Sequence, residues 1–199
     1  MKILIIGSTG TIGKEVYHHL KDSHEVFGAH RNSNTYPVDI TNKESIISLF
    51  EKLPKLDAVI NAAGTASWKH FQDLTEEDHY IGIQSKLMGQ VNLIHIAKDY
   101  LNDDGSITLT TGILAEHYEP KASALSLVNG AIHSFVHSAS QELERGIRLN
   151  TVAPGAIAGD FPKDQKFAGY FPVEISDVVK VYAEAITSNK TGQVFKKYE

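Results

Sequence analysis

The 199-residue chain has no cysteine, which excludes a disulfide framework and any chemistry carried by a thiolate. It also lacks an excess of basic residues, since 19 lysines and arginines stand against 24 aspartates and glutamates. The resulting net charge of −5 offers no electrostatic footprint for nucleic acid, so we expect no nucleic-acid partner. The absence of cysteine fits a reducing compartment, and the expected location is cytoplasmic.

Long apolar runs are missing as well. The N-terminal stretch MKILIIGSTG holds only four apolar residues between Lys2 and Gly7. That run is too short for a secretory signal core or a membrane span, so we expect no membrane association. No repeat, low-complexity segment or flexible linker divides the chain. With 42% apolar residues it can build a sizeable core, and one domain over residues 1–199 is predicted.

Short apolar runs alternate with helical patterns, which is typical of a parallel sheet with crossover helices. The predicted strands are Lys2–Ile6, Glu25–Ala29, Tyr36–Val38, Ala58–Asn61, Ser106–Thr110, Arg148–Val152 and Gln193–Phe195. The predicted helices are Gly13–Lys21, Lys43–Leu53, Thr75–Gly89 continuing through Tyr100, Ala124–Arg145 and Ser176–Ser188. The fold class is therefore α/β, a three-layer doubly wound sheet that binds ligands beyond the carboxyl ends of its strands.

The helix expected over residues 124–145 carries apolar residues at helical spacing. They predict one buried face, made of Leu127, Ala131, Phe135, Ala139 and Leu143.

The first predicted strand runs directly into a glycine-rich turn before a helix. Glycines let the backbone turn tightly and approach a pyrophosphate, whose charge is stabilised by the helix N-terminus. A plain tight turn is the alternative, but the strand–turn–helix context favours a phosphate site. The residues of this turn are Gly7, Ser8, Thr9, Gly10, Thr11, Ile12 and Gly13.

Together with three later segments, this turn resembles the short-chain dehydrogenase/reductase family, and the resemblance covers essentially the whole chain. The later segments are Val38-Asp39-Ile40, Asn61-Ala62-Ala63-Gly64, and Gly146–Asn150 leading into Ala153-Pro154-Gly155-Ala156-Ile157. The resemblance implies a Rossmann fold and a nicotinamide cofactor. One departure is a middle glycine that comes one place early, which gives GxxGxxG rather than GxxxGxG.

The resemblance also assigns cofactor contacts by position. Asp39 and Ile40 would flank the adenine, and Asn61, Ala62 and Gly64 would support the middle of the cofactor. Pro154, Gly155 and Ile157 would lie against the nicotinamide.

The choice of cofactor depends on the end of the second predicted strand. His30 occupies the place where NAD-preferring sites commonly have a carboxylate, and Arg31 follows it. A guanidinium can bind a 2′-phosphate through paired, charge-assisted hydrogen bonds. The alternative is that Arg31 is a solvated loop residue. We favour NADP(H).

The residues expected to carry the chemistry have changed. In the family, a tyrosine transfers a proton while a lysine four residues later lowers its pKa; here these positions hold Leu125 and Asn129. The hydroxyl that polarises the carbonyl falls on Thr111 or on Gly112. The helix asparagine of the family's proton relay falls on Lys86.

We therefore hypothesise that Lys86 and Asn129 face each other across the pocket beside Thr111, and that Lys86 replaces the missing relay. The alternative is that Lys86 is a surface lysine.

Several nearby residues are weaker candidates. His117 and Tyr118 lie in the loop after the fifth predicted strand, and Trp68 and His70 are expected to form a lid or wall. His133 and His137 are four residues apart on a helix, yet no third ligand is evident, so no metal site is expected. They are interpreted as a helix-face pair, for which a subunit interface is one location, because small residues on this helix permit close packing in a homodimer or higher homo-oligomer.

Three functions remain open. The first is an NADP(H)-dependent oxidoreductase with a rewired site, acting on an unknown small carbonyl or alcohol. The second is a catalytically silent NADP(H)-binding sensor that acts through a partner. The third is an assembly scaffold without nucleotide.

Overall fold

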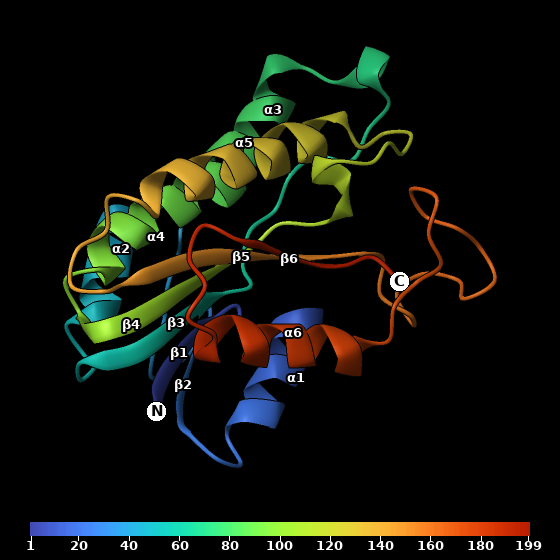
Figure 1. Cartoon of the computed structure of the whole chain (residues 1–199). Helices are drawn as coiled ribbons and strands as arrows, with labels where there is room; N and C mark the ends of the chain where they lie inside the picture. Colours follow the sequence, from blue (N-terminus) through green and yellow to red (C-terminus); the bar gives the residue numbers. More distant parts are fainter.

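A computed structural model describes all 199 residues and contains one six-stranded, fully parallel sheet (Figure 1). The strand order is β2-β1-β3-β4-β5-β6. The chain passes from β1 to β2 on one side and returns to β3 on the other, which creates a topological switch point at the carboxyl end of β1. The strands are β1 (Lys2–Ile6), β2 (Glu25–Ala29), β3 (Leu56–Asn61), β4 (Leu101–Thr110), β5 (Arg148–Pro154) and β6 (Val194–Lys197).

Successive side chains along each strand point to opposite faces of the sheet, and both faces are buried. In β1, Leu4 and Ile6 belong to one apolar core, whereas Ile3 and Ile5 belong to another. Helices α1 (Thr11–Leu20) and α6 (Ile175–Thr187) cover the Ile3 face, and α2 (Lys43–Phe50), α4 (Gly89–Ala97) and α5 (Ser123–Ala139) cover the other (Figure 1). The predicted three-layer doubly wound architecture is therefore confirmed.

The helix predicted from Thr75 is present but not uniform. Thr75 and Asp78 form a capping box that begins α3 (Glu76–Gly82). A π-helical turn, η2 (Ile83–Met88), follows before α4 continues to Ala97. Such turns insert one extra residue and occur frequently at functional sites.

One predicted strand is absent, and the predicted bounds of several elements were wrong, most of all those of α5 and β4. Residues 36–38 form no strand, because Pro37 makes only an isolated bridge to His30 and the Tyr36 amide donates to the Ser33 hydroxyl. Helix α5 ends at Ala139 rather than at Arg145, which has a positive φ. Strand β4 begins at Leu101, before the predicted start.

The predicted buried face of α5 was right only in part. Phe135, Ala139 and Leu143 are partly buried against the core, whereas Leu127 is 49% exposed. The fully buried positions include Val128, Ile132 and Val136. Both stripes are apolar at helical spacing, and the β-branched stripe packs on the sheet.

No helix of the structure is long and apolar enough to cross a membrane.

Candidate functional site

The glycine turn after β1 is as tight as its sequence predicts. Gly7 has a φ of +85°, a conformation that favours glycine, and a Cβ there would lie 2.8 Å from the Ala62 backbone. A Cβ on Gly13 would lie 2.2 Å from the Gly7 carbonyl oxygen, so this helix packs directly on the turn. Gly10 precedes α1 with no side-chain cap. The first amides of the helix are therefore left for a ligand.

Three cavities surround this turn at the carboxyl ends of the strands. The first, about 510 Å³, has Ser8, Thr9 and His30 among its lining residues. The second, about 360 Å³, lies between the turn and Ile157. The third, about 250 Å³, is lined by residues from four segments: Ile6, Gly7, His30, Arg31, Val38, Ile40, Ala63, Gly64, Thr65 and Ser85. Segments predicted to bind the cofactor thus meet around one turn.

Lys14 was missed by the sequence reasoning. It follows Gly13 in the first turn of α1 and lines both the first and the second cavity. A cation beside a predicted phosphate site is chemically suited to it. Its place directly after the last glycine of the motif was the available signal.

Arg31 is paired with another predicted cofactor residue. Its guanidinium lies 3.3 Å from the Asp39 carboxylate, while its side chain is 70% exposed. Hydrogen bonds from the Thr41 backbone and hydroxyl, and then the charge of Arg31, lower the pKa of Asp39. Arg31 can therefore turn toward an incoming phosphate at little cost, because an exposed pair of this kind contributes little stability.

Two buried asparagines present amide oxygens that have no hydrogen-bond partner. Asn61, at the end of β3, uses its amide nitrogen on the Ala63 carbonyl at 2.9 Å, but its Oδ1 is free. Asn129 on α5 is only 2% exposed, and its Oδ1 is also free. Buried polar atoms without a partner are costly, so both point to a bound donor. The glycine cradle and these two oxygens fit a nicotinamide dinucleotide.

Lys86 is buried within the π-helical turn, and this excludes the surface interpretation. It is 8% exposed, and a Cβ on Gly64 would meet its side chain at 3.2 Å. No carboxylate pairs with its ammonium group. Burial alone lowers the pKa of Lys86 to about 8.

The carboxyl end of β4 lies near the backbone of Lys86 and the side chain of Asn129. The Gln90 amide nitrogen donates to the carbonyls of Lys86 at 2.9 Å and Thr110 at 3.2 Å, which ties η2 to this strand. A Cβ on Gly112 would lie 3.6 Å from the Asn129 amide nitrogen. These contacts place the backbone of Lys86 and the side chain of Asn129 near the end of β4, where Thr111 follows.

Leu125, at the position where the family has tyrosine, packs against a small apolar cluster. This cluster includes Ile113, Leu114, Ala122 and Ala168. No titratable group replaces the tyrosine on this turn of α5. Proton transfer, if it occurs, must come from another element.

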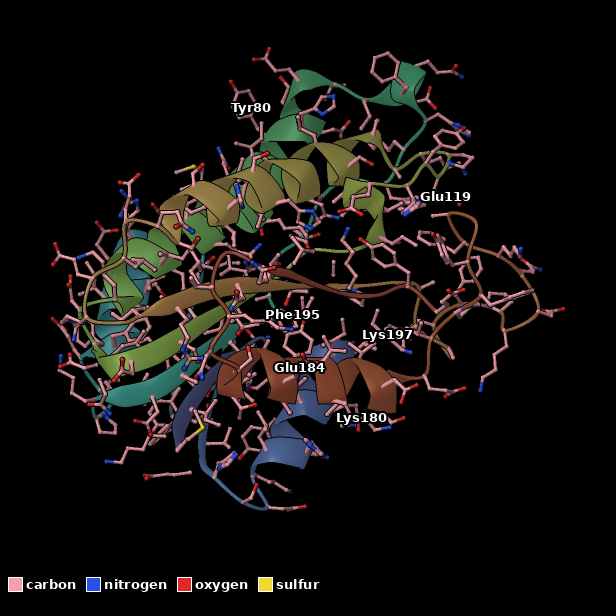
Figure 2. All side chains as sticks on the ribbon, viewed as in Figure 1. Tyr80, Glu119, Lys180, Glu184, Phe195 and Lys197 are labelled. Atoms are coloured by element: carbon pink, nitrogen blue, oxygen red, sulfur yellow. The ribbon has the colours of Figure 1, made fainter.

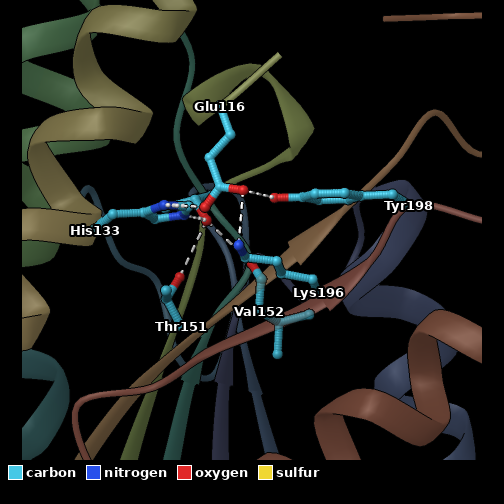
Figure 3. Close-up of polar contacts among 7 residues, drawn as sticks. Glu116, His133, Thr151, Val152, Lys196 and Tyr198 are labelled. Atoms are coloured by element: carbon cyan, nitrogen blue, oxygen red, sulfur yellow. Dashed lines mark hydrogen bonds and ion pairs between the residues drawn. The ribbon is translucent and has the colours of Figure 1, made fainter. Parts of the chain in front are cut away.

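The Thr111 hydroxyl turns toward α5 and β5. It lies 2.8 Å from His133 Nε2 and 3.3 Å from the Thr151 hydroxyl. The other ring nitrogen of His133, Nδ1, lies 3.7 Å from Glu116, whose carboxylate also contacts Lys196 and Tyr198 (Figure 3). His133 therefore does not form the helix-face pair that was predicted with His137, which is exposed. Nothing in the sequence indicated this contact, because it joins residues from three separate elements.

The remaining candidates form aromatic walls. Trp68 stacks on Phe167 with ring centroids 6.0 Å apart, so loops after β3 and β5 meet. His117 packs edge-to-face on Tyr170 and Tyr198, whereas Tyr118 is largely exposed. No group of three or more potential ligands is placed to hold a metal ion.

Taken together, these observations define a doubly wound α/β protein whose glycine turn and free asparagine oxygens fit a nicotinamide dinucleotide. Residues 12–173 match the family described as "Enoyl-(Acyl carrier protein) reductase". The chain belongs to the short-chain dehydrogenase/reductase family.

Solved structures extend the match to the whole chain. "The crystal structure of the protein lin1944 from Listeria innocua" is similar with a TM-score of 0.94 and 39% identity, over 100% of both chains. A small-chain dehydrogenase in complex with NADPH has a TM-score of 0.86 and 26% identity, over 98% of this chain and 95% of that one.

Among curated proteins, a "Short chain dehydrogenase" of Claviceps purpurea (strain 20.1) is 32% identical over 142 residues. These residues cover 68% of this chain and 54% of that protein. The chain thus spans about half the length of the curated relatives it matches.

Proposed function

We propose that the chain is an NADP(H)-dependent oxidoreductase that acts on a small carbonyl compound or alcohol, with Lys86 in place of the usual tyrosine. The observation that carries this proposal is a buried lysine without a carboxylate partner, whose side chain packs beside Gly64 and whose neighbour Ser85 lines the third cavity. A buried charge of this kind is expensive to maintain and is typical of functional sites.

Lys86 has the protonation behaviour that carbonyl reduction requires. With a pKa of about 8, it is mostly protonated at neutral pH and still able to release a proton. A nicotinamide dinucleotide held by the glycine turn would supply the hydride for the carbonyl carbon. Lys86 then gives its proton to the carbonyl oxygen, and the neutral amine recovers a proton from solvent.

Asn129 and Thr111 complete the proposed site. The free Oδ1 of Asn129 can accept a hydrogen bond from the Lys86 ammonium group or from a ribose hydroxyl. Thr111 provides a hydroxyl at the point where the family polarises the substrate, since Gly112 has no side chain to do so.

NADP(H) is preferred over NAD(H) in this proposal because two cations line the cavities beside the turn. Arg31 and Lys14 can both meet a 2′-phosphate, and no carboxylate follows β2 before Asp39. A similar structure has been solved with NADPH.

A second candidate function is a catalytically silent NADP(H)-binding sensor. The observation in its favour is that Leu125 is held in an apolar cluster and Asn129 cannot titrate, so both usual proton-transfer groups are gone. A sensor would bind the cofactor without turning over any substrate.

Homodimer formation is also proposed, through the side of the molecule formed by α3, η2 and α5. Large apolar side chains there are exposed, and Tyr80 projects away from the sheet (Figure 2). The others are Ile81, Met88 and Leu127. An apolar stripe spread over adjacent helices is suited to a self-complementary interface.

The test is an NADPH fluorescence titration, followed by oxidation of bound NADPH with aldehydes, ketones, quinones and an enoyl thioester. Wild type and the exposed-lysine control Lys52→Met should bind and turn over, whereas Lys86→Met should bind NADPH and lose at least 100-fold in kcat, the scale of a general acid. Binding without any turnover by wild type would favour the sensor. No binding would refute both.

A further inference from the structure

A row of three side chains, Thr111, His133 and Glu116, joins the proposed site to the edge of the sheet. His133 Nε2 lies 2.8 Å from the Thr111 hydroxyl, and His133 Nδ1 lies 3.7 Å from Glu116 Oε1. The other oxygen of Glu116 contacts Lys196 Nζ at 2.7 Å and the Tyr198 hydroxyl at 3.4 Å (Figure 3). A hydroxyl, an imidazole and a carboxylate are thus held in a row.

The carboxylate determines which nitrogen of a neutral imidazole carries the proton. With Glu116 facing Nδ1, the favoured neutral form has hydrogen on Nδ1, since a lone pair there would face an anion. Nε2 is then an acceptor, and its only close partner is Thr111. The single proton of the Thr111 hydroxyl is therefore directed to His133 and cannot be donated elsewhere.

A second proton on His133 reverses this hydrogen bond. Nε2–H then donates to the Thr111 oxygen, which frees the Thr111 proton. Within the protein, the free proton has only the Val152 carbonyl oxygen at 3.4 Å and the Thr151 hydroxyl at 3.3 Å as long, weak alternatives. A substrate carbonyl oxygen would be a better acceptor.

We propose that His133 is a positioning residue that lets Thr111 donate a hydrogen bond to substrate only when the imidazole is protonated, so that Thr111-dependent reduction is favoured by mild acidity. This inference rests on the proposed oxidoreductase function. The titratable groups around the imidazole are Glu116, which faces it directly, and Lys196 and Tyr198, which contact the Glu116 carboxylate.

The neighbouring charges allow the pKa of His133, and with it the pH at which the hydrogen bond reverses, to be changed by mutation. Burial lowers the pKa of His133, the carboxylate of Glu116 raises it, and the ammonium group of Lys196 lowers it. Removing Lys196 should therefore raise the pKa of His133, and removing the Glu116 charge should lower it further. The exposed His137, one turn along α5, provides a matched control.

The first measurement is the tautomer and titration of His133 by ¹⁵N and ¹³C NMR, assigned by the signals lost in His133→Asn. We expect the Nδ1–H tautomer, a pKa below 6.5, an upward shift in Lys196→Met and a downward shift in Glu116→Gln. His137→Asn should leave the His133 titration unchanged. An Nε2–H tautomer would overturn the proposal whether or not the protein turns over.

The second measurement is the pH profile of kcat for NADPH oxidation. The rate should rise as pH falls through the pKa of His133, and the profile should move with that pKa in Lys196→Met and Glu116→Gln. Thr111→Ser should keep this dependence and Thr111→Val should lose it. A profile that stays fixed while the NMR titration moves would overturn the proposal. Absence of turnover would instead refute the proposed function, and the tautomer would still decide the hydrogen-bond direction.

Discussion

Replacing Lys86 by methionine should make the folded protein more stable while removing its activity. Burial holds the pKa of this lysine at about 8, against an ordinary value of 10.5. Each pKa unit is worth about 1.4 kcal/mol, so keeping the ammonium group buried costs about 3 kcal/mol. Methionine has a similar length, carries no charge and fills the same space beside Gly64.

The pH dependence gives this prediction a clear sign. Between about pH 8 and 10.5 the unfolded lysine is protonated and the folded one is not, so the stability of wild type rises with pH across this window. Below pH 8 the penalty is complete. Lys86→Met should therefore exceed wild type by about 3 kcal/mol at pH 7, and the gap should close by pH 10.5.

The assay is urea unfolding of wild type, Lys86→Met and Lys52→Met at pH 7, 9 and 10.5. For a chain of this size, about 3 kcal/mol corresponds to about 6–12 °C in Tm, so thermal unfolding at pH 7 provides a second reading. Lys52→Met should match wild type throughout. A Lys86→Met variant that is no more stable at pH 7, or whose advantage is independent of pH, would show that the lysine is not held as a buried cation.

Three further predictions concern the turn, the cofactor and the assembly. Gly13→Ala should cost about 1–3 kcal/mol in unfolding free energy and abolish NADPH binding, because its Cβ would lie 2.2 Å from a carbonyl oxygen. Gly10→Ala, whose Cβ would have its nearest neighbour at 3.5 Å, should keep its unfolding midpoint. Arg31→Ala should weaken NADPH binding about 10–100-fold in a fluorescence titration, the value of one or two charge-assisted hydrogen bonds, and leave NADH unchanged; equal loss for both cofactors would argue against a 2′-phosphate contact. Leu127→Asp should shift light-scattering mass from dimer to monomer, and a wild-type monomer would refute the proposed interface.

The sheet could be predicted because its strands are short apolar runs separated by helical periods. Both faces of β1 are covered, so its sequence is a continuous run of Ile3, Leu4, Ile5 and Ile6 that no other element type fits as well. The segment at residues 36–38 misled the prediction, because Pro37 cannot donate to a sheet ladder.

The rest of the site depended on contacts that sequence spacing does not contain. Spacing alone could not choose between the Leu127 and Val128 stripes of α5, since both repeat at helical intervals. The contact between His133 and Thr111 joins a helix to a strand, and Glu116 reaches it from a third segment. Such a cluster becomes visible only when the fold brings the three elements together.

The π-helical turn η2 has a consequence for which changes in chain length this protein can accept. Its extra residue is taken up by the wider local winding, so its loss would leave the rotational phase of α4 relative to α3 nearly unchanged. Deleting one residue from the regular winding of α3 would instead rotate one helix by about 100° relative to the other, since an α-helix has 3.6 residues per turn. Gln90 would then turn away from Thr110, and the two hydrogen bonds that join this helix to β4 would be lost. Relatives with a rewired site should therefore keep the length of this helix even where its residues differ.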